Sequence, residues 1–290
     1  DSSTSRGLGD VYKRQILNAA NEVIAHNFGR KEKRLWTENE KGDKVDFRQF
    51  QNGFEEAEYV AGEISKMVRF GEGHYGDVAV LYRTNAQSRL FEEKLLLANI
   101  PYKLVGGVNF YARREIKDLL AYLKTIDNAQ DDLAVQRIIN VPKRGIGATT
   151  IGKVMNHAAE QEINFYDALL EVQYIPGMSR SLAKIESFTN FIQRLRAESE
   201  FYSVKELLEH IIEETGYVKE LEAEDTDEAR ARIENIDEFI SKIVTYEEEN
   251  EEPTLSGFLQ EVALVADIDS VEDGSDYVLS LIHISEPTRR

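Results

Sequence analysis

The chain has 290 residues, 42% of them hydrophobic and 30% charged, with a formal net charge of −18 and no cysteine. This composition is typical of a globular protein with one large or two ordinary domains, and it excludes disulfides and thiolate chemistry. There is no run of about 18 apolar residues to span a membrane, and the five scattered histidines lack zinc-ligand spacing. We therefore expect a cytoplasmic protein without a metal site.

The charges are distributed unevenly along the chain. Acidic residues are concentrated between about Glu198 and Glu252, whereas the region from Arg83 to Arg144 is richer in cations. Because local charge rather than net charge decides whether a protein binds phosphate, the net charge does not exclude nucleic acid as a partner.

Both ends of the chain have an unusual sequence. Residues 1–15 and 279–290 resemble translated sequencing-adapter sequence, so they are left out of the fold prediction. We therefore expect an internal fragment of a longer gene product, in which residues 277–279 begin a returning strand.

Helical and extended patterns alternate in the first part of the chain. Apolar spacing predicts helices over residues 16–28, 55–70 and 88–97. Residues 44–50 alternate like a half-buried strand, and residues 78–82 form an apolar run typical of a strand buried on both faces of a parallel sheet. With a further strand predicted over residues 102–105, the pattern indicates an α/β layer.

Strands nearly vanish after Arg114. Apolar stripes at three- and four-residue spacing predict helices over residues 116–126, 132–139, 149–157, 164–170, 181–196, 204–215, 228–246 and 254–265. The expected fold class is therefore α/β followed by all-α.

Residues 141–151 (VPKRGIGATTI) combine glycines, cations and threonines at the start of a predicted helix. Glycine permits a tight turn and close backbone approach, and a threonine here is expected to cap the helix. A helix N-terminus beside cations is a site for phosphate. The residues predicted to contact the phosphate are Lys143, Arg144, Gly145, Gly147, Thr149 and Thr150. The alternative is a helical corner whose cations are only solvated.

Residues 82–89 (YRTNAQSR) lie between a predicted strand and a predicted helix, where ligands collect in α/β sheets. Arginine and asparagine suit phosphate contacts, and a tyrosine can stack on a base. The residues predicted to contact single-stranded nucleic acid are Tyr82, Arg83, Asn85 and Arg89. The alternative is a capped loop in which Arg89 is solvated.

Residues 106–118 follow the next predicted strand and place two aromatic residues, Phe110 and Tyr111, among cations. Such interleaving is a common way to grip a single strand. The alternative is a hinge between domains, with Phe110 as a packing anchor.

These three segments stand in an order and spacing that resembles the UvrD/Rep/PcrA type of superfamily 1A bacterial DNA helicase, and its PcrA branch most closely. The resemblance covers residues 16 to about 278. It implies that residues 16–109 are part of a RecA-like motor domain, called 2A, and that residues 110–276 form a helical insertion domain, called 2B. Members of the family translocate 3′→5′ on single-stranded DNA with ATP and Mg²⁺, in DNA repair or replication.

The resemblance also implies roles for individual residues. The matching positions are Arg83 and Asn85, beside Tyr82, for single-stranded DNA; Gly145, Gly147 and Thr150 for the duplex backbone; and Asp131 and Asp132 for the orientation of 2B. The expected partner is DNA, bound through its backbone without base specificity.

The sequence departs from the family pattern in its catalytic motifs. It contains no Gly-x-x-x-x-Gly-Lys-Ser/Thr loop, no Gly-x-Ser-x-Gly elbow and no His-Glu-x-x-His pair. The first motor domain, with its Walker A and Walker B motifs, is missing. We therefore expect no catalytic residue in this chain, no tight ATP binding and no unwinding by the chain alone.

Two other functions remain open at this point. The chain is also consistent with a non-catalytic interaction module whose working surface is the acidic region 198–252, although such charge runs are usually solvated helix faces. A fragment of a related helicase-nuclease subunit is the second alternative. Phosphate binding would weaken steeply as salt rises, and this separates the helicase prediction from the acidic module.

Overall fold

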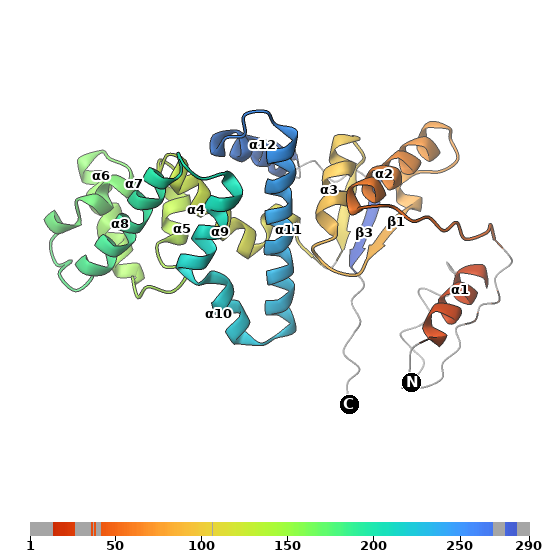
Figure 1. Ribbon diagram of the computed structural model, residues 1–290, viewed down its shortest axis with the longest axis horizontal. Helices are drawn as coiled ribbons and strands as arrows, with labels where there is room; N and C mark the ends of the chain where they lie inside the picture. The colour runs from red at the N-terminus through yellow and green to blue at the C-terminus, as the bar shows by residue number, and fades with distance from the viewer. Residues whose placement is uncertain are drawn as a thin grey trace. The chain divides into compact units, whose positions relative to one another are not determined.

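The computed structural model describes residues 14–26, 36, 38, 42–105, 107–268 and 276–282 (Figure 1). The chain divides into two compact units, residues 1–51 and 52–290. Most of the adapter-like ends lies outside the described residues, and their origin stays a prediction.

The first unit contains helix α1 (Arg14–Ala25), so the helix predicted over residues 16–28 is confirmed as far as Ala25. The strand predicted over residues 44–50 is wrong. These residues form no strand, and the Phe47 side chain is 84% exposed. Alternating side chains form a strand only where a neighbouring strand and an apolar surface receive them. The described residues of this unit provide neither.

The second unit begins with an α/β layer. Its elements are α2 (Gly53–Arg69), the short helix η1 (Tyr75–Asp77), β1 (Ala79–Tyr82), α3 (Ser88–Leu97), β2 (Tyr102–Val105) and β3 (Val278–Ile282). The three strands are parallel in the order β1-β3-β2, and Tyr82 lies opposite Ile282. Asn52 caps α2 by accepting a hydrogen bond from the Glu55 N–H at 2.9 Å.

Only one face of β1 is buried, so the prediction of a strand buried on both faces is wrong. Val80 and Tyr82 point into the core, whereas Leu81 is 63% exposed. Val80 packs with residues of α2 and α3, and among the described strands β1 lies at the edge of the sheet beside β3. An apolar run therefore identified the strand but not the number of its covered faces.

The central strand of the sheet is β3, to which the chain returns only after the whole helical region that follows β2. The returning strand predicted at residues 277–279 is found at Val278–Ile282. Residues 280–282, which were left out of the fold prediction, complete this strand, which pairs with both β1 and β2.

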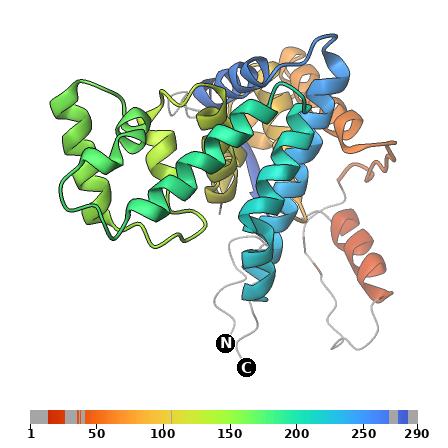
Figure 2. The same ribbon diagram turned by 60° about the vertical axis from the view of Figure 1, so that its left-hand side comes forward.

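A helical region is inserted between β2 and β3 (Figures 1 and 2). Its elements are η2 (Phe110–Ala112), α4 (Arg114–Asp127), α5 (Asp132–Ile138), α6 (Ala148–Gln161), α7 (Phe165–Leu170), η3 (Val172–Tyr174), α8 (Leu182–Glu198), α9 (Val204–Thr215), α10 (Tyr217–Glu224), α11 (Asp227–Glu249) and α12 (Leu255–Ile268). Every helix predicted here is present. The sequence predicted no helix over residues 217–224, where α10 lies directly after Gly216, whose φ of +68° ends α9.

The buried hydrophobic residues of the second unit form two clusters. One joins α2, α3 and the sheet, and the other runs through the helical region from Phe110 onward. The boundary between the clusters falls between Leu104 and Phe110. The helical region therefore has a core of its own.

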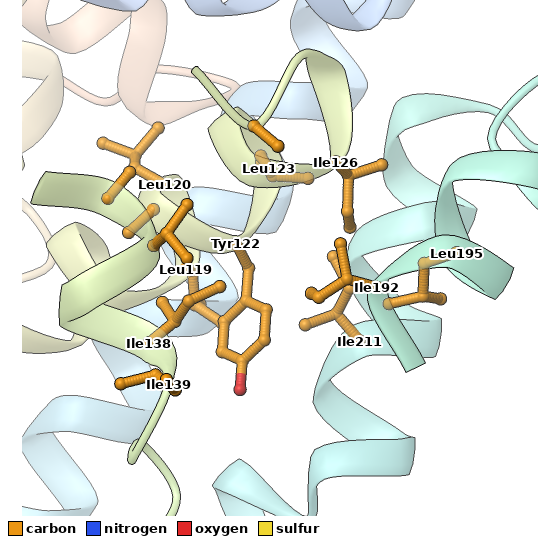
Figure 3. Packing of buried hydrophobic residues seen from close by; sticks show 14 of the residues in the cluster. Leu119, Leu120, Tyr122, Leu123, Ile126, Ile138, Ile139, Ile192, Leu195 and Ile211 are labelled. Atoms are coloured by element: carbon orange, nitrogen blue, oxygen red, sulfur yellow. The ribbon is translucent and has the colours of Figure 1, made fainter. Parts of the chain in front are cut away.

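Tyr122 of α4 lies in the middle of the helical core. Figure 3 shows its ring between Ile138 and Ile139 on one side and Ile192 and Ile211 on the other. Burial raises the pKa of the Tyr122 hydroxyl, which therefore stays protonated and donates a hydrogen bond to the Val141 carbonyl at 2.5 Å. This bond ties the core to the loop that follows α5.

None of the helices in the described ranges combines the length and apolar character needed to cross a bilayer. Nor does this part of the chain bring together three or more histidine, aspartate or glutamate residues in a way that would hold a metal ion.

Candidate nucleic-acid interface

The loop between α5 and α6 is closed by Arg144. Its guanidinium donates hydrogen bonds to the carbonyl oxygens of Ile138 at 2.8 Å and Val141 at 3.1 Å, and to the Tyr122 hydroxyl at 2.5 Å. It also lies over the Phe188 ring, 5.3 Å from the centroid. These contacts occupy the guanidinium. Arg144 was expected to bind phosphate, but its contacts favour bracing the loop instead.

Asn140 and Gly145 set the shape of this loop. The Asn140 side-chain oxygen accepts hydrogen bonds from the N–H groups of Arg144 at 2.8 Å and Ile146 at 3.2 Å. Gly145 has a φ of +70°, a conformation that strains other residues. Its carbonyl accepts a hydrogen bond from the Lys184 ammonium at 3.0 Å. The glycine at position 145 is therefore needed for the turn itself.

Gly147 has a different role, as the N-cap of α6. Its backbone is extended, with φ −84° and ψ 166°, and it supplies no side-chain cap. A Cβ atom added there would meet nothing within 4 Å. The turn does not require glycine at this position, but glycine leaves the helix end open to close approach by a large partner.

The N-terminus of α6 presents free donors. The N–H groups of Thr150 and Ile151 bond to the Gly147 carbonyl, whereas those of Ala148 and Thr149 have no acceptor within the helix. Such donors, with the helix dipole, favour an anion. The prediction that Thr149 or Thr150 caps α6 is wrong, because the helix already begins at Ala148.

A second loop lies beside the start of α6. The hydroxyls of Thr150 and Ser181 share a hydrogen bond at 3.0 Å, and the Lys153 ammonium donates to the Gly177 carbonyl at 3.1 Å. Arg180, next to Ser181, is exposed. Both loops therefore bring cations to one helix end.

We call this arrangement the α6 surface. It comprises the free N–H groups of Ala148 and Thr149 and the side chains of Lys143, Lys153, Arg180 and Lys184. Lys153, Arg180 and Lys184 were missed in the sequence. The sequence did contain a signal for the second loop. Residues 175–177 (IPG) resemble residues 141–145 (VPKRG), because in both an apolar residue is followed by a proline and then, at once or after two residues, by a glycine.

A groove of about 890 Å³ also borders Lys143, but its lining has mixed charge. Glu186, Glu214 and Glu220 lie in it together with Arg194, whose guanidinium pairs with Glu214. Carboxylates repel phosphate, so we do not count this groove as part of the α6 surface.

Two of the residues predicted to contact single-stranded DNA are buried. Tyr82 stacks on Phe91 with 6.3 Å between ring centroids, and its hydroxyl accepts a hydrogen bond from Ser280. Arg89 is 3% exposed and pairs with Glu93 at 3.1 Å and Glu238 at 2.7 Å. A ring in the core cannot stack on a base, and a guanidinium held by two carboxylates does not bind phosphate. The burial of both side chains argues against these two predictions.

The other two candidates lie on an ordered turn. The Gln87 side-chain oxygen accepts hydrogen bonds from the N–H groups of Arg83 at 2.8 Å and Thr84 at 3.2 Å. Arg83 is exposed and Asn85 is half-buried. These positions remain candidates for contact with a single strand.

The aromatic pair after β2 belongs to the core, as the packing-anchor alternative proposed. Phe110 is fully buried and meets Tyr111 edge to face at 5.2 Å. The Tyr111 hydroxyl donates to Glu93 at 2.7 Å, and burial together with this carboxylate raises its pKa well above the ordinary value. Neither ring is a platform for bases. Gly106, from the same predicted segment, lies outside the described residues.

Asp131 caps α5, and Asp132 contacts the start of α7. Asp131 accepts a hydrogen bond from the Ala134 N–H at 3.0 Å, and Asp132 accepts one from the Phe165 N–H at 2.8 Å. Their hydrogen bonds in the described structure stay within the helical region. A role in orienting that region remains a prediction.

The sequence is similar to proteins of known family. The UvrD-like helicase C-terminal domain matches residues 13–285. The chain is 46% identical over 273 residues to the ATP-dependent DNA helicase PcrA of Staphylococcus epidermidis, covering 93% of this chain and 37% of that protein. It is 44% identical over 259 residues to PcrA of Bacillus subtilis, covering 89% of this chain and 35% of that protein.

The chain thus spans little more than a third of the length of these relatives. The family match covers nearly all of its residues, including the inserted helical region and both candidate DNA-binding segments. The chain belongs to the UvrD-like helicase C-terminal domain family.

Proposed function

We propose that the chain is the DNA-binding part of an ATP-dependent 3′→5′ DNA helicase, with residues 16–109 in a RecA-like domain 2A and residues 110–276 in a helical domain 2B. The relatives are named as ATP-dependent DNA helicases. A parallel sheet interrupted by a helical region with its own core supports this division. The longer protein would act in DNA repair or replication in the cytoplasm.

The α6 surface is proposed to bind the duplex backbone. The observation that carries this proposal is the uncapped helix N-terminus, with open space at Gly147 and cations from two loops around it. Lys143 and Thr149 are exposed on it, and Thr150 ties its two loops together. Main-chain donors and lysines contact phosphate without reading bases, so binding is expected to be independent of sequence.

Residues 82–89, which we call the single-strand segment, are proposed to contact the unpaired strand. Arg83 supplies an exposed guanidinium at the carboxyl end of β1, and Asn85 supplies an amide two residues later. Ligands gather at this end of the strands in parallel sheets. ATP and Mg²⁺ are assigned to the longer protein, because the printed sequence contains no P-loop to hold a triphosphate.

The replacement Arg83→Ala tests the single-strand assignment. We expect it to weaken binding of a fluorescent dT oligomer about three- to tenfold, because one charge-assisted phosphate contact is lost. Duplex affinity should change by less than about twofold. Fluorescence anisotropy with both DNAs measures the two effects on the same protein.

Arg69→Ala is the matched control, since Arg69 is also exposed but lies at the far end of α2. It changes the net charge equally and should leave both affinities unchanged. Equal losses in the two variants would mean that only overall charge matters, and the assignment of Arg83 would be wrong.

A further inference from the structure

Arg113 occupies the junction between the α/β layer and the helical region. It is the last residue before α4 and is only 6% exposed. A buried guanidinium requires partners for its donors and a compensating charge. Glu92 lies 4.0 Å away and supplies a carboxylate.

The donors of Arg113 reach the single-strand segment. Nη1 donates to the Asn85 carbonyl at 2.9 Å, and Nη2 donates to the Ser88 hydroxyl at 2.7 Å. Asn85 lies in the turn that carries Arg83, and Ser88 begins α3 directly after that turn. The buried guanidinium therefore fixes the backbone of this turn, while the Arg83 side chain stays exposed.

The same guanidinium also contacts the helical region. Nη1 donates to the Asn235 side-chain oxygen of α11 at 2.7 Å, and Asn235 in turn donates to Glu115 of α4 at 2.6 Å. Burial lowers the pKa of Arg113, whereas Glu92 and Glu115 oppose that change. One residue thus joins the turn to two helices of the inserted region.

We infer that Arg113 is a positioning residue that holds the single-strand segment in its binding shape and fastens it to α11. This inference rests on the proposed function of that segment. A planar guanidinium reaches a carbonyl, a hydroxyl and an amide at once, whereas a lysine ammonium is a single point that cannot span them.

The test is the replacement Arg113→Lys in the full chain, which keeps the charge beside Glu92. Amide hydrogen exchange over residues 84–89 should become about tenfold faster, because the turn loses its anchor. Affinity for a dT oligomer should fall about five- to tenfold, with duplex affinity within about twofold. Ser88→Ala removes one of the partners and should produce a smaller change in the same direction, should the lysine variant not fold.

Glu238→Gln is the matched control, because it weakens the ion pair of Arg89 with α11 but leaves the hydrogen bonds that Arg113 donates to Asn85, Ser88 and Asn235 in place. Exchange over residues 84–89 should stay at the wild-type rate in this variant. Unchanged exchange in Arg113→Lys, or equal acceleration in Glu238→Gln, would overturn the inference. Failure of the wild-type chain to bind the dT oligomer would instead refute the proposed function, and the exchange rates would still decide the role of Arg113.

Discussion

Replacing Gly147 with aspartate is expected to weaken duplex binding by about tenfold or more while leaving the fold intact. The position is an N-cap with extended backbone and open space around it, so the side chain fits without strain. Aspartate is a favourable N-cap and should maintain or slightly raise stability. Its carboxylate would occupy the free N–H groups of α6 and repel a phosphate approaching them.

Gly147→Asn is the matched control for this variant, since asparagine caps a helix about as well and has nearly the same shape. The difference between the two variants isolates the effect of charge. Duplex and dT-oligomer affinities are measured side by side by anisotropy, with the dT affinity expected to stay within about twofold. If both variants bind duplex equally well, or if Gly147→Asp loses the two DNAs in parallel, the α6 assignment is wrong.

Replacing Arg144 with methionine is expected to lower the free energy of unfolding by about 2 to 4 kcal/mol. The change leaves the carbonyls of Ile138 and Val141 without the guanidinium donor that closes the loop. The Tyr122 hydroxyl loses its charged partner as well. Urea denaturation followed by circular dichroism at constant pH and salt measures the loss.

Arg180→Met is the control for Arg144→Met, because Arg180 is an exposed cation near the same helix end. It should change stability by less than about 0.5 kcal/mol but weaken duplex binding about threefold. Loss of Arg144 should thus lower mainly the stability, whereas loss of Arg180 should lower mainly the duplex affinity. An Arg144→Met variant that is as stable as the wild type but binds duplex poorly would restore Arg144 as a direct phosphate ligand.

Helical periodicity predicted most of the second unit correctly, because each amphipathic helix buries its apolar stripe in the core. The period of two over residues 44–50 did not form a strand, because a strand also depends on a neighbour that the local sequence does not specify. For the same reason the central place of β3 was not predictable, since its partners in β1 and β2 lie far away in the sequence, as the pairs Ala79↔Leu279 and Tyr102↔Val278 show.

The candidate sites show a similar limit. The turn within residues 141–151 was visible in the sequence, because the glycine that positive φ favours at position 145 is a local feature. The uncapped end of α6 was not, since a threonine was expected to cap it. Burial of Tyr82 and Arg89 was not visible, because it depends on Phe91, Ser280 and the carboxylates that fold around them. From the sequence alone, an arginine near the end of a strand is predicted to contact phosphate, because the carboxylates that pair with it in the fold are not known.

The salt dependence of duplex binding by the 290-residue chain tests the central claim that the α6 surface grips the DNA backbone despite a net charge of −18. If the four cations of that surface each neutralise a phosphate, the logarithm of the association constant should fall linearly with the logarithm of salt concentration, with a slope of about −3 to −4. Arg180→Met should reduce that slope by about one. A slope near zero, or no duplex binding at low salt, would contradict the claim and favour an acidic interaction module instead.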